Sequence, residues 1–425
     1  MKFVIQYILK ILSKAILKKY DPDVIGITGS VGKTSTKEAV KAVLEKHSNV
    51  RASIKNYNNE IGVPLTIIGE SSPAKSSVGW LKVFLKALKL ILIEDKSYPQ
   101  KLILEMGADK VGDIGYLVKL APCDIGVVTS VSEVHFEFFK SLKKIEKEKR
   151  KIIEHLKDNN FALLNRDSEI VWRMRDKTKA KVLSFGFDGS AQVRCSDATI
   201  SYKNGKPNGM SFKVIFEGRV VPVFVPKILG YGQIYSVLSA IAIGTIYEIN
   251  LLDIVESLNK FSPPKGRMNL IKGIKQSLII DDTYNSSPDS VKSALEIMQE
   301  IELPEHAKKI VVLGDMLELG SYTEEGHKQV GLSVAQNGID ILITKGEASR
   351  EIAASAISAG MSKDKVFNFS DNEKAGRFLQ ERISKGDLIL IKGSQGMRLE
   401  QIVKEVMARP LQAEKLLVRQ GKAWR

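Results

Sequence analysis

The residues best suited to chemistry form a glycine-rich turn, T-G-S-V-G-K-T, at residues 28–34. An apolar run that predicts a buried strand precedes the turn, and a helical pattern from Thr34 to about Lys46 follows it. A turn between a strand and a helix N-terminus binds phosphate through its backbone N–H groups and the helix dipole. Lys33 adds a positive charge, and the Thr34 hydroxyl can bind Mg²⁺. We therefore predict that the chain binds ATP or GTP.

The turn is a shortened variant of the usual phosphate-binding pattern. In the strict spacing G-x-x-x-x-G-K-[ST], a glycine would stand at the position of Ile27. A glycine turn with no phosphate role is the alternative, but strand, lysine and hydroxyl all coincide here. We assign nucleotide binding to the turn and the residues that open the helix, namely Gly29, Ser30, Val31, Gly32, Lys33, Thr34 and Ser35.

Three further polar features predict parts of the same site. Asn56, Asn58 and Asn59 precede a Gly-x-Pro turn and either form a turn themselves or bind a polar substrate or phosphate. Glu105 ends a strand-like run, where a carboxylate is well placed to hold Mg²⁺ or its waters. His135 follows another such run; a lone histidine is usually structural, but we expect this one at the same sheet edge.

The elements that position these residues follow an α/β rhythm. Strand-like and helical patterns alternate from Val24 to about Gly186, with buried-strand candidates at 102–105, 125–129 and 162–165. This predicts a mostly parallel sheet with helices on its faces. Alternation between about 192 and 226 predicts a few antiparallel strands, and helical patterns follow at 233–249 and 252–260.

A second α/β unit is expected beyond a Pro- and Gly-rich linker at 262–266. Its strand-like runs end at 281–282, 314–315, 345–346 and 392–394, where ligands of doubly wound sheets bind. Arg267 lies just after the linker, and an arginine delivered by a second domain is suited to stabilise a transferring phosphoryl group. We expect a basic N-terminal helix (1–20), a P-loop central domain (21–262) and a Rossmann-like C-terminal domain (263–425).

The overall composition narrows the class of protein. A chain of 425 residues with 44% apolar and 27% charged residues is typical of a globular protein with two or three domains. The two cysteines lack metal-ligand spacing, which favours a reducing, cytoplasmic setting. The net charge of +15 suits nucleic acid, an anionic membrane surface or a polyanionic substrate. No recognition helix or aromatic-interleaved basic strand is present, so we do not expect nucleic-acid binding.

Two basic amphipathic segments, residues 1–18 and 79–93, repeat one design of apolar residues interrupted by lysines. The lysines interrupt the first segment too often for it to span a bilayer. Such helices lie in a membrane interface or pack against the body of the protein, and the sequence leaves both open.

Six ordered motifs, covering roughly residues 22 to 410, resemble those of the Mur ligase family, ATP-dependent amide-bond-forming enzymes of peptidoglycan synthesis. The motifs are T-G-S-V-G-K-T (28–34), N-Y-N-N-E-I-G-V-P-L-T (56–66), L-E-M-G-A (104–108), D-D-T-Y-N-S-S-P-D-S (281–290), V-L-G-D-M-L-E-L-G (312–320) and K-G-S-Q-G-M-R-L-E (392–400). The residues of these motifs are most similar to those of family members that add D-Ala-D-Ala to a muramyl tripeptide.

The resemblance implies roles for individual residues. Lys33 and Thr34 would hold the ATP phosphates and Mg²⁺, with Glu105 and His135 completing metal coordination. Lys149 matches a family lysine that CO₂ carbamylates and that helps to bind a second Mg²⁺. Residues of the second domain would reach the nucleotide (Arg267, Asp282, Tyr284 and Asn285) or receive the incoming dipeptide (Asp315, Glu318, Lys392 and Ser394).

The resemblance also implies a reaction. A substrate carboxylate attacks the γ-phosphate of ATP to give an acyl phosphate, and the amine of the dipeptide then displaces phosphate. Lys33, Lys149 and His135 would be the catalytic residues. The implied partners are a muramyl-peptide substrate and D-Ala-D-Ala. Contact with the inner face of the cell membrane through residues 1–18 and 79–93 is a hypothesis that comes from the amphipathic segments themselves and not from the resemblance. We expect a monomer.

Three departures from the family pattern bear on the substrate. Only about twenty residues precede the phosphate-binding turn, where the family carries a domain that grips UDP, and 79–93 has the character of an insertion. The family's G-x-H-N-x-x-N stretch is replaced by G-Y-G-Q-I-Y-S at 230–236, and K-G-S-R is replaced by K-G-S-Q at 392–395. A ligase with another acceptor or a lipid-linked substrate, and a nucleotide-binding scaffold without catalysis, are the alternatives.

Overall fold

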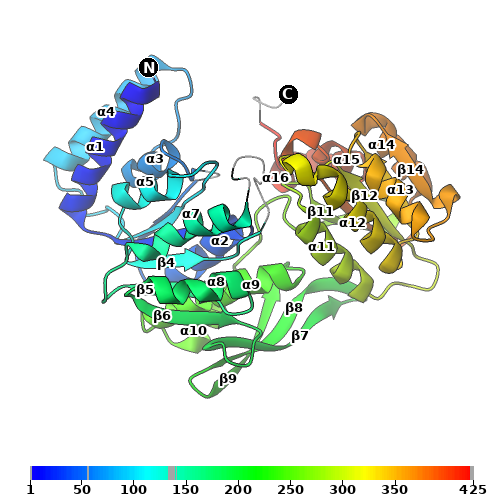
Figure 1. Cartoon of the computed structure of the whole chain (residues 1–425), viewed down its shortest axis with the longest axis horizontal. Coiled ribbons are helices and arrows are strands. Elements are labelled where there is room, and N and C mark those ends of the chain that lie inside the picture. The colour runs from blue at the N-terminus through cyan, green and yellow to red at the C-terminus, as the bar shows by residue number, and fades with distance from the viewer. Residues whose placement is uncertain (1, 55–56, 133–138, 140, 422–425) are drawn as a thin grey trace.

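The computed structural model describes residues 2–54, 57–132, 139 and 141–421. Two α/β units lie side by side, one coloured blue to green and the other yellow to red (Figure 1). Each is built on its own sheet, of nine strands in the first and six in the second. The expected fold class, a P-loop domain with a mostly parallel sheet followed by a doubly wound domain, is confirmed.

The first sheet has the strand order β2-β3-β1-β4-β5-β6-β7-β8-β9, parallel from β2 through β7. Its parallel part contains the four strands expected from the sequence, β1, β3, β4 and β5, and others around them. The bounds are β1 Asp23–Thr28, β2 Val50–Ala52, β3 Lys101–Glu105, β4 Ile125–Val128, β5 Phe161–Asn165 and β6 Lys181–Gly186.

Both faces of this sheet are covered, because its strands alternate apolar side chains between two cores. Ile25 and Ile27 of β1 face a core built with α2, α9 and α10, whereas Val24 faces a second core. The helices of the first core are α2 Lys33–Leu44, α9 Tyr231–Ile246 and α10 Leu251–Leu258. Those of the opposite side are α1 Lys2–Tyr20, α3 Gly62–Ile68, α4 Ser77–Leu92, α5 Asp113–Leu120, α7 Leu142–Glu154 and α8 Glu169–Trp172, followed by the 3₁₀ turn η1 Arg173–Lys177.

Three long antiparallel strands extend the sheet, as the alternation between 192 and 226 predicted. They are β7 Val193–Lys203, β8 Lys206–Phe216 and β9 Arg219–Pro226. They run beneath both units in the view of Figure 1 and reach the second unit, where the Tyr202 hydroxyl accepts a hydrogen bond from the Glu302 N–H at 3.1 Å. The extension therefore braces one domain against the other.

The second sheet has the order β10-β11-β15-β12-β13-β14, parallel except for β10. Four strands end at the positions expected from the sequence; the antiparallel edge strand β10 and the short β14 were not anticipated. The bounds are β10 Asn269–Lys272, β11 Leu278–Asp282, β12 Lys309–Gly314, β13 Ile341–Lys345, β14 Val366–Phe369 and β15 Leu388–Lys392.

Helices cover both faces of the second sheet as well. Helices α11, α12 and α13 pack on one face, and α14 and α15 on the other. Their bounds are α11 Pro288–Glu300, α12 Thr323–Gln336, α13 Arg350–Ser358, α14 Asn372–Arg382, α15 Glu400–Val406 and α16 Ala413–Leu416. The 3₁₀ turns are η2 Ile274–Gln276, η3 Gly320–Tyr322, η4 Lys363–Lys365, η5 Gln395–Met397 and η6 Pro410–Gln412.

The two lysine-interrupted segments are helices that lie side by side at the edge of the molecule opposite the second domain (Figure 1). Helix α4 begins at Ser77, whose preceding residue Ser76 caps it by accepting a hydrogen bond from the Gly79 N–H. The Lys19 ammonium donates to the Leu90 and Ile91 carbonyl oxygens, so the C-terminal ends of α1 and α4 meet. Within the described residues, neither these nor any other helix has the length and apolar character needed to cross a bilayer.

Candidate active site

The phosphate-binding turn is held open against the end of strand β4. The Ser30 N–H donates to the Ser130 carbonyl oxygen at 2.9 Å, and the Val31 N–H donates to the Ser130 hydroxyl at 2.9 Å. Gly29 has a φ of +151°, and a Cβ there would lie 1.9 Å from the Thr129 hydroxyl oxygen. Gly32 begins α2 with a φ of +89°. Glycine is therefore required at the close approach, and the turn leads directly into the N-terminus of α2, the end of a helix that attracts anions.

Lys33 lies within this turn, where its ammonium is hydrogen-bonded to backbone carbonyl oxygens. Its ammonium donates to the Gly29 carbonyl oxygen at 2.6 Å and to the Ser30 carbonyl oxygen at 3.2 Å. Burial lowers the pKa of Lys33, an effect opposed by the nearby Glu105 carboxylate. A phosphate in the turn would add a charge-assisted hydrogen-bond partner for the buried ammonium.

Glu105 ends β3 beside the turn, as the sequence predicted. Its Oε1 atom accepts a hydrogen bond from the Asn58 side-chain amide at 3.1 Å. Its Oε2 atom is buried and has no hydrogen-bond partner among the residues that the structure describes. An unpartnered buried carboxylate oxygen is costly unless a cation or a water occupies the site.

The neighbouring asparagine has a different role. The Asn59 side-chain oxygen accepts hydrogen bonds from the Gly62 N–H at 2.9 Å and the Ile61 N–H at 3.2 Å. Asn59 therefore shapes the turn that begins α3. Of the two roles considered for the asparagines, forming a turn or binding a ligand, this is the first. Asn56 and His135 lie outside the described residues.

Lys149 lies on α7 and is only 4% exposed. Burial and the nearby Lys33 ammonium lower its pKa to about 7, although the Glu148 and Asp109 carboxylates favour the charged form. Glu148, the preceding residue on α7, fixes the start of α5, because its carboxylate accepts hydrogen bonds from the Gly112 and Ile114 N–H groups. The structure thus brings together Lys33, Glu105 and Lys149, which lie far apart in the sequence.

Arg267 of the second domain contacts the phosphate-binding turn. Its Nη2 atom donates to the Thr34 hydroxyl oxygen at 3.3 Å, and its guanidinium lies over the Tyr284 ring at 4.2 Å from the centroid. Its Nε atom is buried and, among the described residues, has no acceptor. The stacked, incompletely paired guanidinium is thus oriented for an anionic ligand at the turn.

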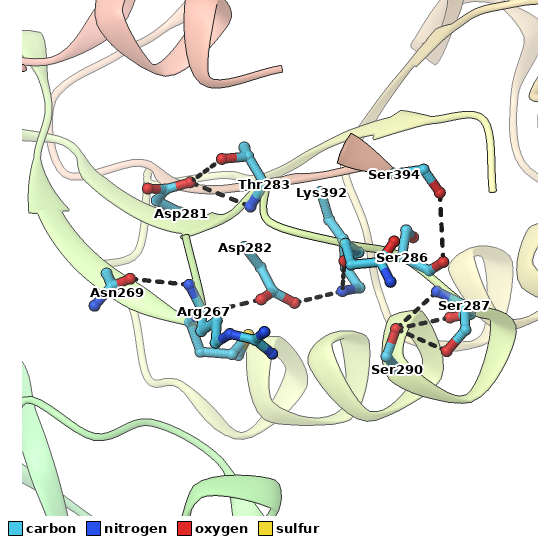
Figure 2. Close-up of polar contacts among 12 residues, drawn as sticks. Arg267, Asn269, Asp281, Asp282, Thr283, Ser286, Ser287, Ser290, Lys392 and Ser394 are labelled. Atoms are coloured by element: carbon cyan, nitrogen blue, oxygen red, sulfur yellow. Dashed lines mark hydrogen bonds and ion pairs between the residues drawn. The ribbon is translucent and has the colours of Figure 1, made fainter. Parts of the chain in front are cut away.

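The polar ends of strands β11 and β15 meet beside Arg267, with Asp282 between Arg267 and Lys392 (Figure 2). The Lys392 ammonium donates to Asp282 Oδ2 at 2.6 Å and to the Asn285 carbonyl oxygen at 2.9 Å. The other Asp282 oxygen accepts from the Met268 N–H at 3.2 Å, next to Arg267. The ion pair therefore ties the loop after β11 to the segment that presents the arginine.

The loop after β12 forms the far side of this sheet edge. Ser349 N–H donates to Asp315 Oδ1 at 2.8 Å, and the Ser394 hydroxyl accepts from the Leu317 N–H at 2.9 Å. Glu318 follows with a φ of +66°. The predicted acceptor-side residues thus gather at the carboxyl ends of β12 and β15, beyond the ion pair of Lys392.

Two residues of the site were missed by sequence reasoning. The Gln233 side-chain amide, on α9 of the first domain, donates to the Arg267 carbonyl oxygen at 3.1 Å. Buried His327 accepts a hydrogen bond from the Met316 N–H at 3.0 Å and so fixes the loop of Asp315. The only sequence feature that pointed to Gln233 is its place in the stretch that departs from the family pattern. No sequence feature pointed to His327, because it is distant in sequence from the loop that it supports.

The fold and the site define a two-domain P-loop enzyme in which the second domain contributes a cation to the phosphate-binding turn. The Mur ligase middle domain model matches residues 27–75 and 84–244, and the Mur ligase glutamate ligase domain model matches residues 266–395. A UDP-N-acetylmuramoyl-tripeptide–D-alanyl-D-alanine ligase of Bacillus subtilis is 32% identical over 95% of this chain and 80% of its own length. The chain belongs to the Mur ligase family.

Other relatives support the same placement. The Escherichia coli ligase of that name is 28% identical over 90% of this chain and 76% of its own length. The crystal structure of the MurF ligase from Thermotoga maritima in complex with ADP superimposes with a TM-score of 0.77 at 26% identity, covering 93% of this chain and 82% of that one. A MurF of Acinetobacter baumannii, at 23% identity and a TM-score of 0.76, shares the fold.

Proposed function

We propose that this chain is an ATP-dependent carboxylate–amine ligase of peptidoglycan precursor synthesis that joins D-Ala-D-Ala to a muramyl tripeptide. The proposal rests on relatives named for that reaction. The observation that carries it is the hydrogen bond from Arg267 to Thr34 at 3.3 Å, which brings the second domain to the phosphate-binding turn.

The reaction would proceed in two steps. A substrate carboxylate oxygen attacks the γ-phosphorus of ATP, the bond to the β,γ-bridging oxygen breaks, and an acyl phosphate and ADP result. The dipeptide amine then attacks the acyl carbon, loses a proton, and phosphate leaves. Lys33 and Arg267 would stabilise the negative charge on the phosphoryl oxygens, because both cations flank the turn.

The residues beside the turn fit Mg²⁺. Glu105 offers a buried oxygen without a partner among the described residues, and the Thr34 hydroxyl lies at the start of α2. Mg²⁺ commonly takes one or two protein carboxylates and completes its coordination with phosphates and water. When bound, the ion would neutralise charge on the phosphates. We assign Thr34 and Glu105 to this ion, with His135 as a further ligand.

We also propose that Lys149 reacts with CO₂. A pKa of about 7 leaves much of the amine neutral near neutral pH, which is the nucleophilic form. Its nitrogen would attack CO₂ and lose a proton, giving a carbamate anion. The carbamate anion would attract Lys33, which the protonated amine repels, and it would add oxygen ligands for a second Mg²⁺.

The second domain would supply the remaining contacts. We assign Asp282, Tyr284 and Asn285 to the nucleotide side and Asp315, Glu318, Lys392 and Ser394 to the dipeptide side. Asn58, which hydrogen-bonds Glu105, is assigned to the acyl substrate. Residues 21–262 and 263–425 are proposed as the two functional domains, and a lipid-linked acyl substrate met at the membrane is the alternative to a UDP-linked one.

Measurement of ATP turnover against amide-bond formation tests the function. Phosphate release should require both a muramyl tripeptide and D-Ala-D-Ala, with one amide bond formed per ATP. UDP-linked and lipid-linked tripeptides compared side by side would identify the carrier. ATP hydrolysis indifferent to both substrates, with no amide product, would instead assign the chain to a nucleotide-dependent scaffold.

A further inference from the structure

Helix α4 exposes a continuous apolar stripe. Side chains spaced by three or four residues lie on one helical face, and on α4 the exposed members of such a row are Val78, Leu81, Leu85, Leu88 and Leu92. Leu92 is 79% exposed and Leu85 is 55% exposed. The opposite side of the helix, with Val83, Ala87 and Leu90, is buried against the protein. A helix that is apolar on both faces is expected where both faces are covered.

Helix α1 contributes a second apolar surface beside the first. Phe3, Val4, Tyr7 and Ile11 are exposed, with Phe3 at 85%. Hydrogen bonds from Lys19 and Tyr20 to the Leu90 carbonyl oxygen join the C-terminal ends of the helices. Because the helices also lie side by side along their length (Figure 1), they run in parallel. The exposed apolar half of α1 consequently lies alongside the first turns of α4, at the molecular edge visible in Figure 1. We call these nine side chains the apolar face.

The charges on these helices are all positive. The two helices contain eight lysines and no Asp or Glu. Lys14, Lys18, Lys82 and Lys89 are exposed beside or beyond the apolar residues. A helix pair of this kind would meet an anionic surface with its lysines while its leucines enter an apolar layer, which is the combination that a bilayer of anionic phospholipids presents. A nucleic acid offers the charge without the apolar layer.

We propose that the apolar face of α1 and α4 docks the protein on the surface of an anionic phospholipid membrane. The helices lie in the interface, with the leucines of α4 in the acyl region and the lysines among the headgroups. The proposal goes beyond the ligase reaction and does not depend on it. It would bring the site close to substrates that are anchored in the membrane.

Flotation of the full chain with phosphatidylglycerol–phosphatidylcholine vesicles tests this docking. We expect the unmodified chain to float with these vesicles and much less with phosphatidylcholine alone. The double variant Leu85→Glu/Leu88→Glu should bind at least about tenfold more weakly, because two exposed leucines lose their apolar burial. Leu252→Glu is the matched control: Leu252 is 65% exposed on α10, away from the apolar face, and its substitution should leave flotation unchanged.

Further measurements show whether the apolar face binds a membrane or a second copy of the chain. Replacing Lys14, Lys18, Lys82 and Lys89 by Gln should weaken binding by about fivefold per contacting lysine and remove the preference for anionic lipid. No flotation of the unmodified chain, or equal flotation of Leu85→Glu/Leu88→Glu, would overturn the proposal. A dimer in sedimentation velocity that this double variant dissociates, without flotation, would assign the face to a second copy.

The same samples separate this proposal from the proposed function. Ligation of a UDP-linked substrate without vesicles should be equal in all the variants, since none lies at the phosphate-binding turn. Flotation with no ligation would count against the ligase alone. Circular dichroism would check that the variants fold, and their exposed positions make loss of folding unexpected.

Discussion

Lys149 and Lys33 lie close together in a buried site, and their charges repel each other. We expect the carbamate of Lys149 to form increasingly as the pH rises through about 7, because only the neutral amine attacks CO₂. The same lowered pKa makes the unfolded chain bind more protons between about pH 7 and the ordinary lysine range, so folding stability should also rise with pH there. ¹³C NMR with labelled bicarbonate would detect the carbamate.

Two variants check the assignment to this residue. Lys149→Ala should lose the carbamate signal and ligase activity, and short carboxylic acids should partly restore the activity. Lys147→Ala, an exposed lysine on the same helix, should change neither. A fully active Lys149→Ala protein would refute the role, and a signal that survives the substitution would place the carbamate elsewhere.

Arg267 is the cation that the second domain supplies. Replacing it by Ala should lower kcat by at least about a hundredfold, since an arginine that stabilises phosphoryl-transfer charge contributes strongly to the rate. Arg267→Lys should recover only part of the rate, because lysine lacks the planar fork that lies over Tyr284. Arg219→Ala, at an exposed position on β9, is the control in an ADP-release assay. Equal rates in all three variants would show that Arg267 is not part of the machinery.

Sequence reasoning found those site residues whose type and local pattern carry chemistry. Lys33, Glu105 and Arg267 each stand at a strand end or a linker, and the structure brings them together. Lys149 could not be chosen by physics from a run of charged residues, because its burial depends on how α7 packs; only the family resemblance indicated it. Gln233 acts through a single hydrogen bond across domains, which no local pattern encodes.

At the scale of elements, the turn before α2 depends on Gly29. Alanine there would place its Cβ 1.9 Å from the Thr129 hydroxyl and would occupy a backbone conformation favoured by glycine. We expect Gly29→Ala to weaken ATP binding by at least about tenfold, since a strained turn costs on the order of 1–3 kcal/mol. Gly232→Ala, in α9, has open space around the added methyl and should bind normally. Calorimetric titration with ATP measures both, and equal affinities would contradict the argument.

The long periodic elements were predictable, and the short ones were not. Buried parallel strands such as β3 and β15 are apolar runs with polar ends, which the sequence displays directly. The three-residue strand β2 and the edge strand β10 are defined by hydrogen bonds to neighbours rather than by their own pattern. In α4, lysine spacing predicted one polar face, but the structure shows a buried apolar side and an exposed apolar stripe with lysines between them.

At the scale of the whole molecule, the two domains meet through contacts far from each other in sequence. The Tyr231 hydroxyl hydrogen-bonds the Glu300 carboxylate at 3.0 Å, and Gln233 hydrogen-bonds the Arg267 carbonyl oxygen at 3.1 Å. Both contacts come from the first turn of α9. Because the first of these contacts reaches α11 and the second reaches the segment that carries Arg267, the start of α9 holds the second domain over the phosphate-binding turn.

This arrangement predicts how the molecule keeps water from the acyl phosphate. Without the Gln233 amide, the segment of Arg267 should be held less firmly, and water should reach the intermediate more often. Gln233→Ala should therefore release more than one phosphate per amide bond formed, whereas the unmodified chain should release one. Gln380→Ala, at an exposed position on α14, should keep the ratio at one. Parallel assays of phosphate and amide product give the ratio; a Gln233→Ala protein that is slower but still coupled would show that the contact serves the rate and not the exclusion of water.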